Sequence, residues 1–248
     1  MQNHACRTMI VSDLHTHILP HIDDGSPDVE TSLAMLRLEA EQGVGHVALT
    51  PHFSARRDDP DRFLTVRERA MAELRAAMPA DAGLPALCLG AEVSYFRGMS
   101  DCEALKDLCI EGTHYILIEL PATRWDSQIL RDLEELPSKQ GLRPIVAHVE
   151  RYLPAFSAGE VLRKLLERPL LLQANAGFFL RRRTAPMALR MLRQGQIHLL
   201  GSDCHDLTER PPELGKAAEL ICRRLGGDAL STIGELGQKI LCPIPAHS

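Results

Sequence analysis

The 248-residue sequence has no run of about 18 apolar residues, so we expect no transmembrane helix. Its first eight residues lack an apolar core as well, and we interpret residues 1–8 as a short N-terminal extension rather than a secretory signal. The chain is not basic either. A formal net charge of −5 and a pI near 6.1 argue against a nucleic-acid partner held by bulk electrostatics.

Paired cysteine spacings are also missing. The seven cysteines occur singly, and this odd count argues against a disulfide framework and favours a reducing cytoplasm. None of them precedes a loop that could cradle a phosphate, so a nucleophilic cysteine is not expected. Because no internal repeat, linker or low-complexity segment interrupts the chain, residues 1–248 are predicted to form one cytoplasmic domain.

What the sequence does contain is a regular alternation of strand and helix patterns. Short, nearly continuous apolar runs predict seven strands covered on both faces: Met9–His15, His46–Thr50, Ala86–Glu92, Tyr115–Leu120, Pro144–Val149, Leu170–Asn175 and Ile197–Ser202. Helical patterns occupy Val29–Gln42, Pro60–Met78, Cys102–Leu108, Ser127–Gln140, Ala158–Glu167, Pro186–Arg193, Pro212–Leu225 and Asp228–Leu241. Repeated strand–helix units predict an α/β fold with parallel strands and right-handed crossovers.

Polar residues end all seven predicted strands. An open doubly wound sheet normally builds its site from two or three strand ends, so this pattern favours a closed or nearly closed barrel. Residue types that bind metals recur at these ends and in one turn after the first strand: His15, His17, Asp24, His52, Glu92, Glu119, His148, Asp203 and His205. So many buried charges would not persist unpaired, and the pattern predicts a metal site rather than a set of structural histidines.

Spacing and chemistry add detail to this site. His15 and His17 are two residues apart, so their imidazoles project to the same side of an extended segment, and Asp203 and His205 repeat that geometry. Mixed imidazole and carboxylate ligands suit Mn²⁺, Fe²⁺ or Zn²⁺ better than Mg²⁺ or Ca²⁺. Nine candidates exceed the needs of two ions, so three divalent ions are expected, with Glu92 as a bridging carboxylate.

Neighbouring polar residues receive secondary roles. Asp24 is expected to be the ligand in its turn and Asp23 a turn or capping residue. Asp13 is interpreted as orienting a ligand histidine, whereas Asn175 could be a ligand or not. Two arginines, Arg151 and Arg210, each follow a ligand motif by a few residues. We expect their guanidinium groups to bind a phosphate oxyanion.

The ordered motifs resemble those of the polymerase and histidinol phosphatase (PHP) superfamily. Within it they are most similar to the bacterial PHP-type protein-tyrosine phosphatases of capsule and exopolysaccharide loci, over residues 9–225. The motifs that carry the resemblance are Asp13-Leu-His15-Thr-His17, Thr50-Pro51-His52, Gly90-Ala91-Glu92, Ile118-Glu119, Ala147-His148-Val149-Glu150-Arg151 and Ser202-Asp203-Cys204-His205.

The resemblance implies a distorted seven-stranded (β/α) barrel with a trinuclear, usually manganese, centre. It places the nine candidates on the family's ligand positions, and Arg151 and Arg210 on its phosphate-binding positions. It also implies hydrolysis of phosphotyrosine on the tail of a membrane-associated bacterial tyrosine kinase, by a metal-activated hydroxide without a covalent intermediate. Two segments, 53–61 and 122–126, match nothing in the family pattern, so substrate preference is left open there.

Three alternatives are left open by the sequence. The chain could hydrolyse a small phosphomonoester such as histidinol phosphate, although an alkoxide leaving group would call for a better-placed acid. It could be a nuclease-like phosphodiesterase, which the acidic net charge disfavours. It could also be a non-catalytic module that binds phosphotyrosine, but the complete set of ligand candidates argues against that.

Overall fold

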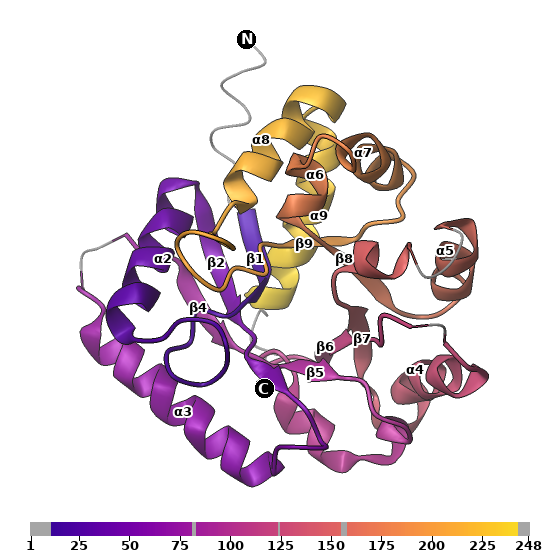
Figure 1. Ribbon diagram of the computed structural model, residues 1–248, viewed down its shortest axis with the longest axis horizontal. Helices are drawn as coiled ribbons and strands as arrows, with labels where there is room; N and C mark the ends of the chain where they lie inside the picture. The colour runs from indigo at the N-terminus through magenta and orange to yellow at the C-terminus, as the bar shows by residue number, and fades with distance from the viewer. Residues whose placement is uncertain (1–10, 81–82, 124, 155–157, 243–248) are drawn as a thin grey trace, which may run out of the picture.

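A computed structural model describes residues 11–80, 83–123, 125–154 and 158–242 of the chain. Within these ranges strands lie in the middle of the molecule and helices surround them (Figure 1). The α/β class predicted from the alternating pattern is therefore confirmed. No helix of the described residues is long and apolar enough to cross a membrane.

The strands of the described residues form two sheets in which every strand pair is parallel. One sheet has the order β1-β2-β4 and comprises Val11–Thr16, Val44–Leu49 and Ala86–Leu89. The other has the order β3-β5-β6-β7-β8-β9 and comprises His52–Phe53, Glu92–Ser94, Tyr115–Glu119, Arg143–Val146, Leu171–Asn175 and Leu199–Gly201.

The third predicted strand, Ala86–Glu92, is divided in two, and a short strand β3 that was not predicted follows the second, which corrects the sequence prediction. Between β2 and β3 lies Pro51, which has no N–H to donate to a ladder. Between β4 and β5 lies Gly90, whose N–H still donates to the carbonyl of Leu49 and so continues the β2–β4 ladder by one bond. His52 and Glu92 begin the short strands β3 and β5, and the two residues are register partners.

The two sheets also meet where β1 lies beside β9. A parallel bridge joins Thr16 to Cys204, and the N–H of Asp203 donates to the carbonyl of His15 at 2.8 Å. Gly201 makes this approach possible, because a Cβ there would lie 2.6 Å from Cβ of His15. The first and last predicted strands are therefore neighbours, as the paired ligand motifs on them required.

Helices follow most strands as predicted. They are α2 (Val29–Glu41), α3 (Pro60–Ala77), α4 (Ser127–Gln140), α5 (Ala158–Leu166), α7 (Ala185–Arg193), α8 (Leu214–Leu225) and α9 (Gly227–Leu241). The predicted helix over Cys102–Leu108 is instead a 3₁₀ helix, Glu103–Leu108, and a short helix α6, Ala176–Leu180, was not predicted. Among the described cysteines Cys222 is disulfide-bonded, whereas the free thiols are Cys88, Cys102, Cys109, Cys204 and Cys242.

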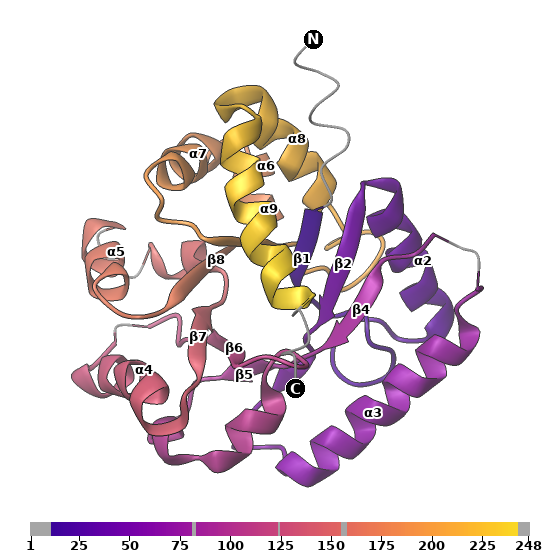
Figure 2. The ribbon, with the colours of Figure 1, turned by 180° about the vertical axis from the view of Figure 1, so that it is seen from behind.

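The apolar core has two parts. The larger part lies between the strands and the surrounding helices. The smaller part gathers side chains from several strands, among them Leu14, Leu117 and Leu199, together with Ile240 and Leu241 of α9. Helix α9 crosses the strands on the side that faces the viewer in Figure 2 and therefore closes that end of the strand assembly. The opposite end, which carries the strands' carboxyl termini, is left for a functional site.

Candidate metal centre

Glu92 lies at the centre of the predicted site and is almost fully buried. Its Oε2 atom is 2.9 Å from Nδ1 of His52, 3.2 Å from Nε2 of His15 and 3.4 Å from Nε2 of His17. Its Oε1 atom is 2.9 Å from Nε2 of His148. One carboxylate thus reaches four imidazoles from three different segments, which is the arrangement expected of a bridging ligand.

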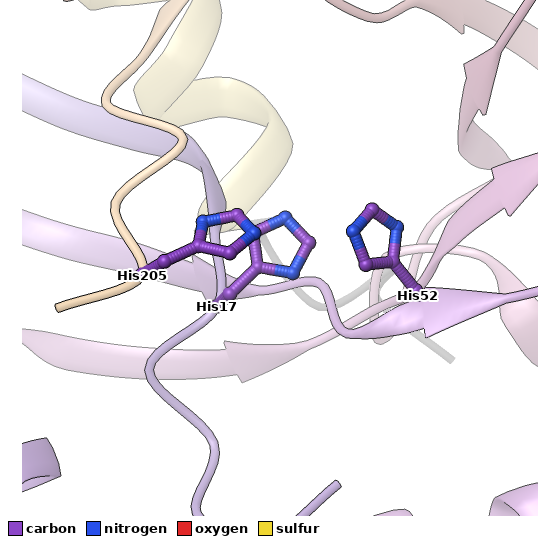
Figure 3. Close-up of side chains that lie close together, drawn as sticks. All are labelled: His17, His52 and His205. Carbon is purple, nitrogen blue, oxygen red and sulfur yellow. The ribbon is translucent and has the colours of Figure 1, made fainter. Parts of the chain in front are cut away.

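Two of the histidines are held with Nε2 directed into the site. Nδ1 of His17 faces the carboxylate of Asp23 at 2.7 Å, and Nδ1 of His205 faces the backbone carbonyl of Asp203 at 3.0 Å. Because a carbonyl can only accept, Nδ1 of His205 carries the proton and its Nε2 keeps a free lone pair. The rings of His17 and His205 lie 3.9 Å apart between centroids, and His52 lies beside them (Figure 3). This tautomer pattern is typical of metal-binding histidines.

Several atoms of the centre have the environment of metal ligands. Nε2 of His15 and Nε2 of His17 are only 3.1 Å apart, and Nδ1 of His15 faces the side-chain oxygen of Gln173. If Nδ1 carries the proton in both rings, two lone pairs face each other, which a cation between them would stabilise. Nε2 of His205 is buried and forms no hydrogen bond with another described residue. Buried polar atoms without partners are costly, so the residues fit bound cations.

Three groups of side chains can each hold one ion. The groups are His17, His52 and His205; His15, His17 and Asp203; and His52, Glu92 and Glu119. In each group the candidate ligand atoms lie within 4.8 Å of one another. His17 and His52 each belong to two groups, so the groups form one connected cluster.

The remaining candidates lie at the edge of this cluster. Oδ1 of Asp24 is 3.5 Å from Nε2 of His52 and 3.6 Å from Nε2 of His205, although its side chain is 70% exposed. Oε1 of Glu119 is 3.5 Å from Nε2 of His148. The structure therefore brings all nine predicted ligands together. The five histidines surround the buried carboxylates of Glu92 and Asp203, and Asp24 and Glu119 lie on the solvent side.

Both predicted phosphate-binding arginines contact one carboxylate, that of Asp203. Arg151 donates to Oδ2 of Asp203, and an N–H of Arg210 lies 2.7 Å from Oδ1. The two guanidinium groups remain 41% and 39% exposed, so they can also reach a ligand at the mouth of the site. The side-chain amide of Asn175 donates to Oδ2 of Asp203 at 2.8 Å, so Asn175 supports this residue instead of facing the imidazoles.

The carboxylates and His205 have pKa values that suit metal binding. Burial would raise the pKa of Glu92, but the imidazoles around it, His15 first, hold that pKa well below its usual range. The pKa of Asp203 is likewise lowered, because the positive charges around it outweigh its burial. Burial and the charges of His17 and Arg210 lower the pKa of His205 to about 4. At neutral pH the carboxylates are therefore ionised and His205 is unprotonated, which are their ligand forms.

Two supporting residues were given other roles in the sequence analysis. Asp23 does form the expected turn, accepting from the N–H of Gly25 at 3.0 Å, but it also orients the His17 ring and accepts from the N–H of His52. Asp13 does not orient a ring: its Oδ1 accepts from the backbone N–H groups of His15 and Ser202. The ring of His15 is oriented by Gln173, a strand-end amide whose role the sequence did not define.

The backbone is strained at two of the candidate ligands. His148 has a φ of 34° and Asp203 a φ of 56°, in a region that non-glycine residues rarely occupy. Such strain costs on the order of 1–3 kcal/mol and clusters at functional sites. In the turn after β1, Gly25 is required by space, because a Cβ there would lie 2.2 Å from the carbonyl oxygen of His17. The close approach folds the turn back over the site, as the sequence predicted.

In each of the two segments that match no family motif, acidic side chains accept hydrogen bonds from the backbone. In 53–61 the carboxylate of Asp58 accepts from the N–H of Ser54, and Asp59 caps the start of α3. In 122–126 Asp126 caps α4 in the same way. Trp125 packs edge-on against Tyr152, whose hydroxyl lies 3.3 Å from Nδ1 of His148. The second segment therefore reaches the centre through Tyr152.

Comparison with known proteins places this centre in a family. Tyrosine-protein phosphatase YwqE of Bacillus subtilis is 28% identical over 239 residues, which cover 92% of this chain and 91% of the relative. Tyrosine-protein phosphatase CpsB of Streptococcus agalactiae is 27% identical over 233 residues, which cover 86% and 90%.

Solved structures resemble the fold. One, from a study of YwqE from Bacillus subtilis and CpsB from Streptococcus pneumoniae as metal-dependent tyrosine phosphatases, has a TM-score of 0.79 at 24% identity, over 92% of this chain and 93% of that chain. A phosphotriesterase homology protein from Escherichia coli has a TM-score of 0.52 at 12% identity, over 93% and 98%. The family model for capsular polysaccharide synthesis, CpsB/CapC, matches residues 11–239 and confirms the resemblance seen in the motifs. The chain therefore belongs to the CpsB/CapC family of capsular polysaccharide synthesis.

Proposed function

We propose that this protein is a metal-dependent protein-tyrosine phosphatase that acts in the cytoplasm on the phosphorylated tail of a membrane-associated bacterial tyrosine kinase, and so regulates capsule or exopolysaccharide synthesis. The observation that carries the proposal is the contact of buried Glu92 with four imidazoles, beside two partly exposed arginines that share Asp203. The two relatives described above are named as tyrosine-protein phosphatases, which supplies the substrate class.

The fold proposed for this activity is one distorted barrel of seven strand positions. In it β2 continues as β3 and β4 continues as β5, while β9 returns to β1 through the Thr16–Cys204 bridge. Such an assembly has one open end, and the carboxyl ends of its parallel strands would surround the substrate.

The nine ligands would hold three divalent ions, with Mn²⁺ as the preferred metal and Fe or Zn as alternatives. When bound, such ions hold phosphate oxygens and lower the pKa of a water molecule, which makes hydroxide available near neutral pH. In this proposal Glu92 would bridge ions and His15, His17, His52, His148 and His205 would supply the imidazole ligands.

Positively charged side chains of the protein would stabilise the phosphate during the reaction. Arg151 and Arg210 would bind the phosphate oxygens and stabilise the negative charge that increases there as the P–O bond breaks. The leaving group is a phenolate with a pKa of about 10, so little proton donation by the protein is needed. No cysteine nucleophile is used, because burial raises the pKa of Cys204, the thiol nearest the centre in the chain. Phosphate would therefore leave without a covalent enzyme intermediate.

One assay separates the candidate activities. A phosphotyrosine peptide and histidinol phosphate are offered to the protein, each with and without added Mn²⁺. The proposal expects Mn²⁺-dependent turnover of the peptide with a much lower kcat/KM for the alkyl phosphate. Faster turnover of histidinol phosphate would assign the chain to small phosphomonoesters. Tight peptide binding without turnover at any metal concentration would instead indicate a phosphotyrosine-binding module.

Metal content is a separate test. Protein purified with manganese supplied should contain close to three ions per chain by elemental analysis, because three overlapping ligand groups are present. A fully active protein with one ion per chain would contradict the trinuclear centre while leaving the phosphatase activity in place.

A further inference from the structure

An unusual concentration of arginine follows strand β8. Between Glu167 and Asp203 the sequence has no acidic residue, in a chain whose formal net charge is −5. Five exposed arginines lie in this stretch and are called the arginine segment below: Arg181, Arg182, Arg183, Arg190 and Arg193.

The arginine segment is not neutralised by neighbouring carboxylates. Other arginines such as Arg151, Arg168 and Arg210 each pair with a carboxylate. No ion pair joins any of the five to a carboxylate of the described residues. Uncompensated positive charge on the surface attracts anionic partners, most strongly at low ionic strength.

The segment begins close to the candidate centre. Asn175, which donates to Asp203, is the residue before α6, and Arg181 directly follows that five-residue helix. At 1.5 Å of rise per residue, α6 separates them by roughly 8 Å. Helix α6 lies in front of α9 in Figure 1 and behind it in Figure 2. Because α9 closes the other end of the strand assembly, α6 lies on the side of the open mouth, and Arg181 directly follows it in the chain.

We propose that the arginine segment binds further phosphate groups of a multiply phosphorylated tyrosine peptide while one of its phosphotyrosines occupies the metal centre. This inference rests on the proposed function. Each phosphate brings a charge of about −1.5 to −2, and guanidinium groups bind it with paired hydrogen bonds. In a polyproline II conformation, with three residues per turn and a rise of about 3.1 Å per residue, phosphotyrosines three residues apart point to the same side and span roughly 9 Å. That span is close to the roughly 8 Å over which α6 separates Asn175 from Arg181.

A peptide fits this surface better than an anionic membrane does. Segments that lie on membranes combine basic residues with apolar side chains that enter the bilayer. The large hydrophobic side chains exposed among the described residues are Leu166 and Leu207, and neither belongs to the arginine segment. The surface also borders a mouth that must stay open to a macromolecular substrate.

The test compares two triple variants with the same change of charge. One is R181S/R182S/R183S; the control is R62S/R69S/R75S, which removes three exposed arginines from α3, on the other side of the molecule (Figure 1). Substrates are p-nitrophenyl phosphate, a singly phosphorylated tyrosine peptide and a peptide with phosphotyrosines three residues apart. The first variant should raise KM for the doubly phosphorylated peptide by on the order of tenfold, with kcat unchanged. KM for the other two substrates should stay at the wild-type value, as should all three values in the control.

Two further readouts keep the inference separate from the proposed function. Fluorescence anisotropy on metal-free protein should show weaker binding of the doubly phosphorylated peptide to R181S/R182S/R183S, and added salt should reduce the difference. An unchanged KM and affinity for that peptide would overturn the inference, even in a protein that hydrolyses phosphotyrosine. Loss of sedimentation with phosphatidylglycerol vesicles, with peptide binding unchanged, would overturn it in favour of a membrane surface. A wild-type protein that hydrolyses no phosphotyrosine substrate would contradict the proposed function instead.

Discussion

The backbone N–H of His148 donates a hydrogen bond of 2.7 Å to the side-chain oxygen of Gln173. The same oxygen lies 3.3 Å from Nδ1 of His15, and the amide nitrogen of Gln173 donates to Asn175, which in turn donates to Asp203. One fully buried amide on β8 therefore links three candidate ligands from three separate strand ends. It also helps to hold His148 in its left-handed backbone conformation.

Gln173→Leu should therefore weaken metal binding without removing any ligand. Leucine has a similar size but cannot accept from His148 or orient the His15 ring, and loss of such support typically lowers metal affinity by about 10–100-fold. Titration of metal-free protein with Mn²⁺ would measure the change. The exposed Gln194, changed to leucine, is the control. An affinity equal to that of the wild type would show that Gln173 supports the fold alone.

His148→Ala should reduce kcat/KM by several orders of magnitude, because His148 reaches both Glu92 and Glu119. His46→Ala should leave the rate near wild type, since its ring lies at the opposite end of its strand. His198→Ala should lose about 1 kcal/mol of stability, because Nδ1 of His198 accepts from the N–H of Leu172, but should keep its rate. Steady-state kinetics on a phosphotyrosine peptide would check all three variants. Similar losses in all of them would mean that the assignment of histidines to the mouth is wrong.

The positions of the nine ligands could be predicted because parallel strands impose a shared direction on their ends. Strand periodicity fixed which side His15 and His17 face, and right-handed crossovers fixed which strands are neighbours. The break between β4 and β5 and the short strand β3 after Pro51 were not predicted. The two short strands β3 and β5 depend on the pairing of His52 with Glu92, which connects two different segments. A local pattern contains no information about such a contact.

The supporting residues were harder to identify for the same reason. Asp23 and Asp24 are adjacent in a turn, and composition alone cannot tell which carboxylate turns inward. In the structure Asp23 is buried against His17 while Asp24 is largely exposed. Gln173 was noticed as a strand-end amide, but its hydrogen bond to His148 spans 25 residues of sequence. Tertiary contacts of this kind decide roles that residue type leaves open.

Arg151→Ala and Arg210→Ala should separate phosphate binding from metal assembly. Asn175 still donates to Asp203 in either variant, so we expect the metal content to stay at the wild-type value. The value of kcat/KM should fall by on the order of 10²-fold or more, with kcat affected, if each guanidinium meets charge that develops in the transition state. Arg→Lys should rescue only part of the loss, because an ammonium group cannot form the two-pronged contact. Normal kinetics with full metal content would show that this arginine does not bind the phosphate.

A buried pair of carboxyl groups joins strand β1 to helix α2. Glu39 of α2 and Asp13 are both fully buried, and their carboxyl groups lie within hydrogen-bonding reach of each other. Burial and the charge of Asp13 raise the pKa of Glu39 well above its usual range. The pKa of Asp13 is also raised, because burial outweighs its hydrogen bonds to Ser202 and His15. At least one of the two carboxyl groups is therefore protonated in the folded protein at pH values at which the unfolded chain has already released that proton.

This pair predicts a pH dependence of stability. The contribution of the bound proton is complete below the unfolded pKa of Glu39, near 4.5, and is lost as the pH rises toward the folded pKa. Glu39→Gln has no proton to lose, so its stability relative to the wild type should increase from pH 5 to pH 8, by up to about 1.4 kcal/mol per pH unit. Urea unfolding of the metal-free proteins at several pH values would measure this difference. Glu41→Gln, an exposed change on the same helix, should follow the wild type at every pH. Curves for Glu39→Gln that run parallel to the wild type would show that Glu39 is already ionised in the folded protein.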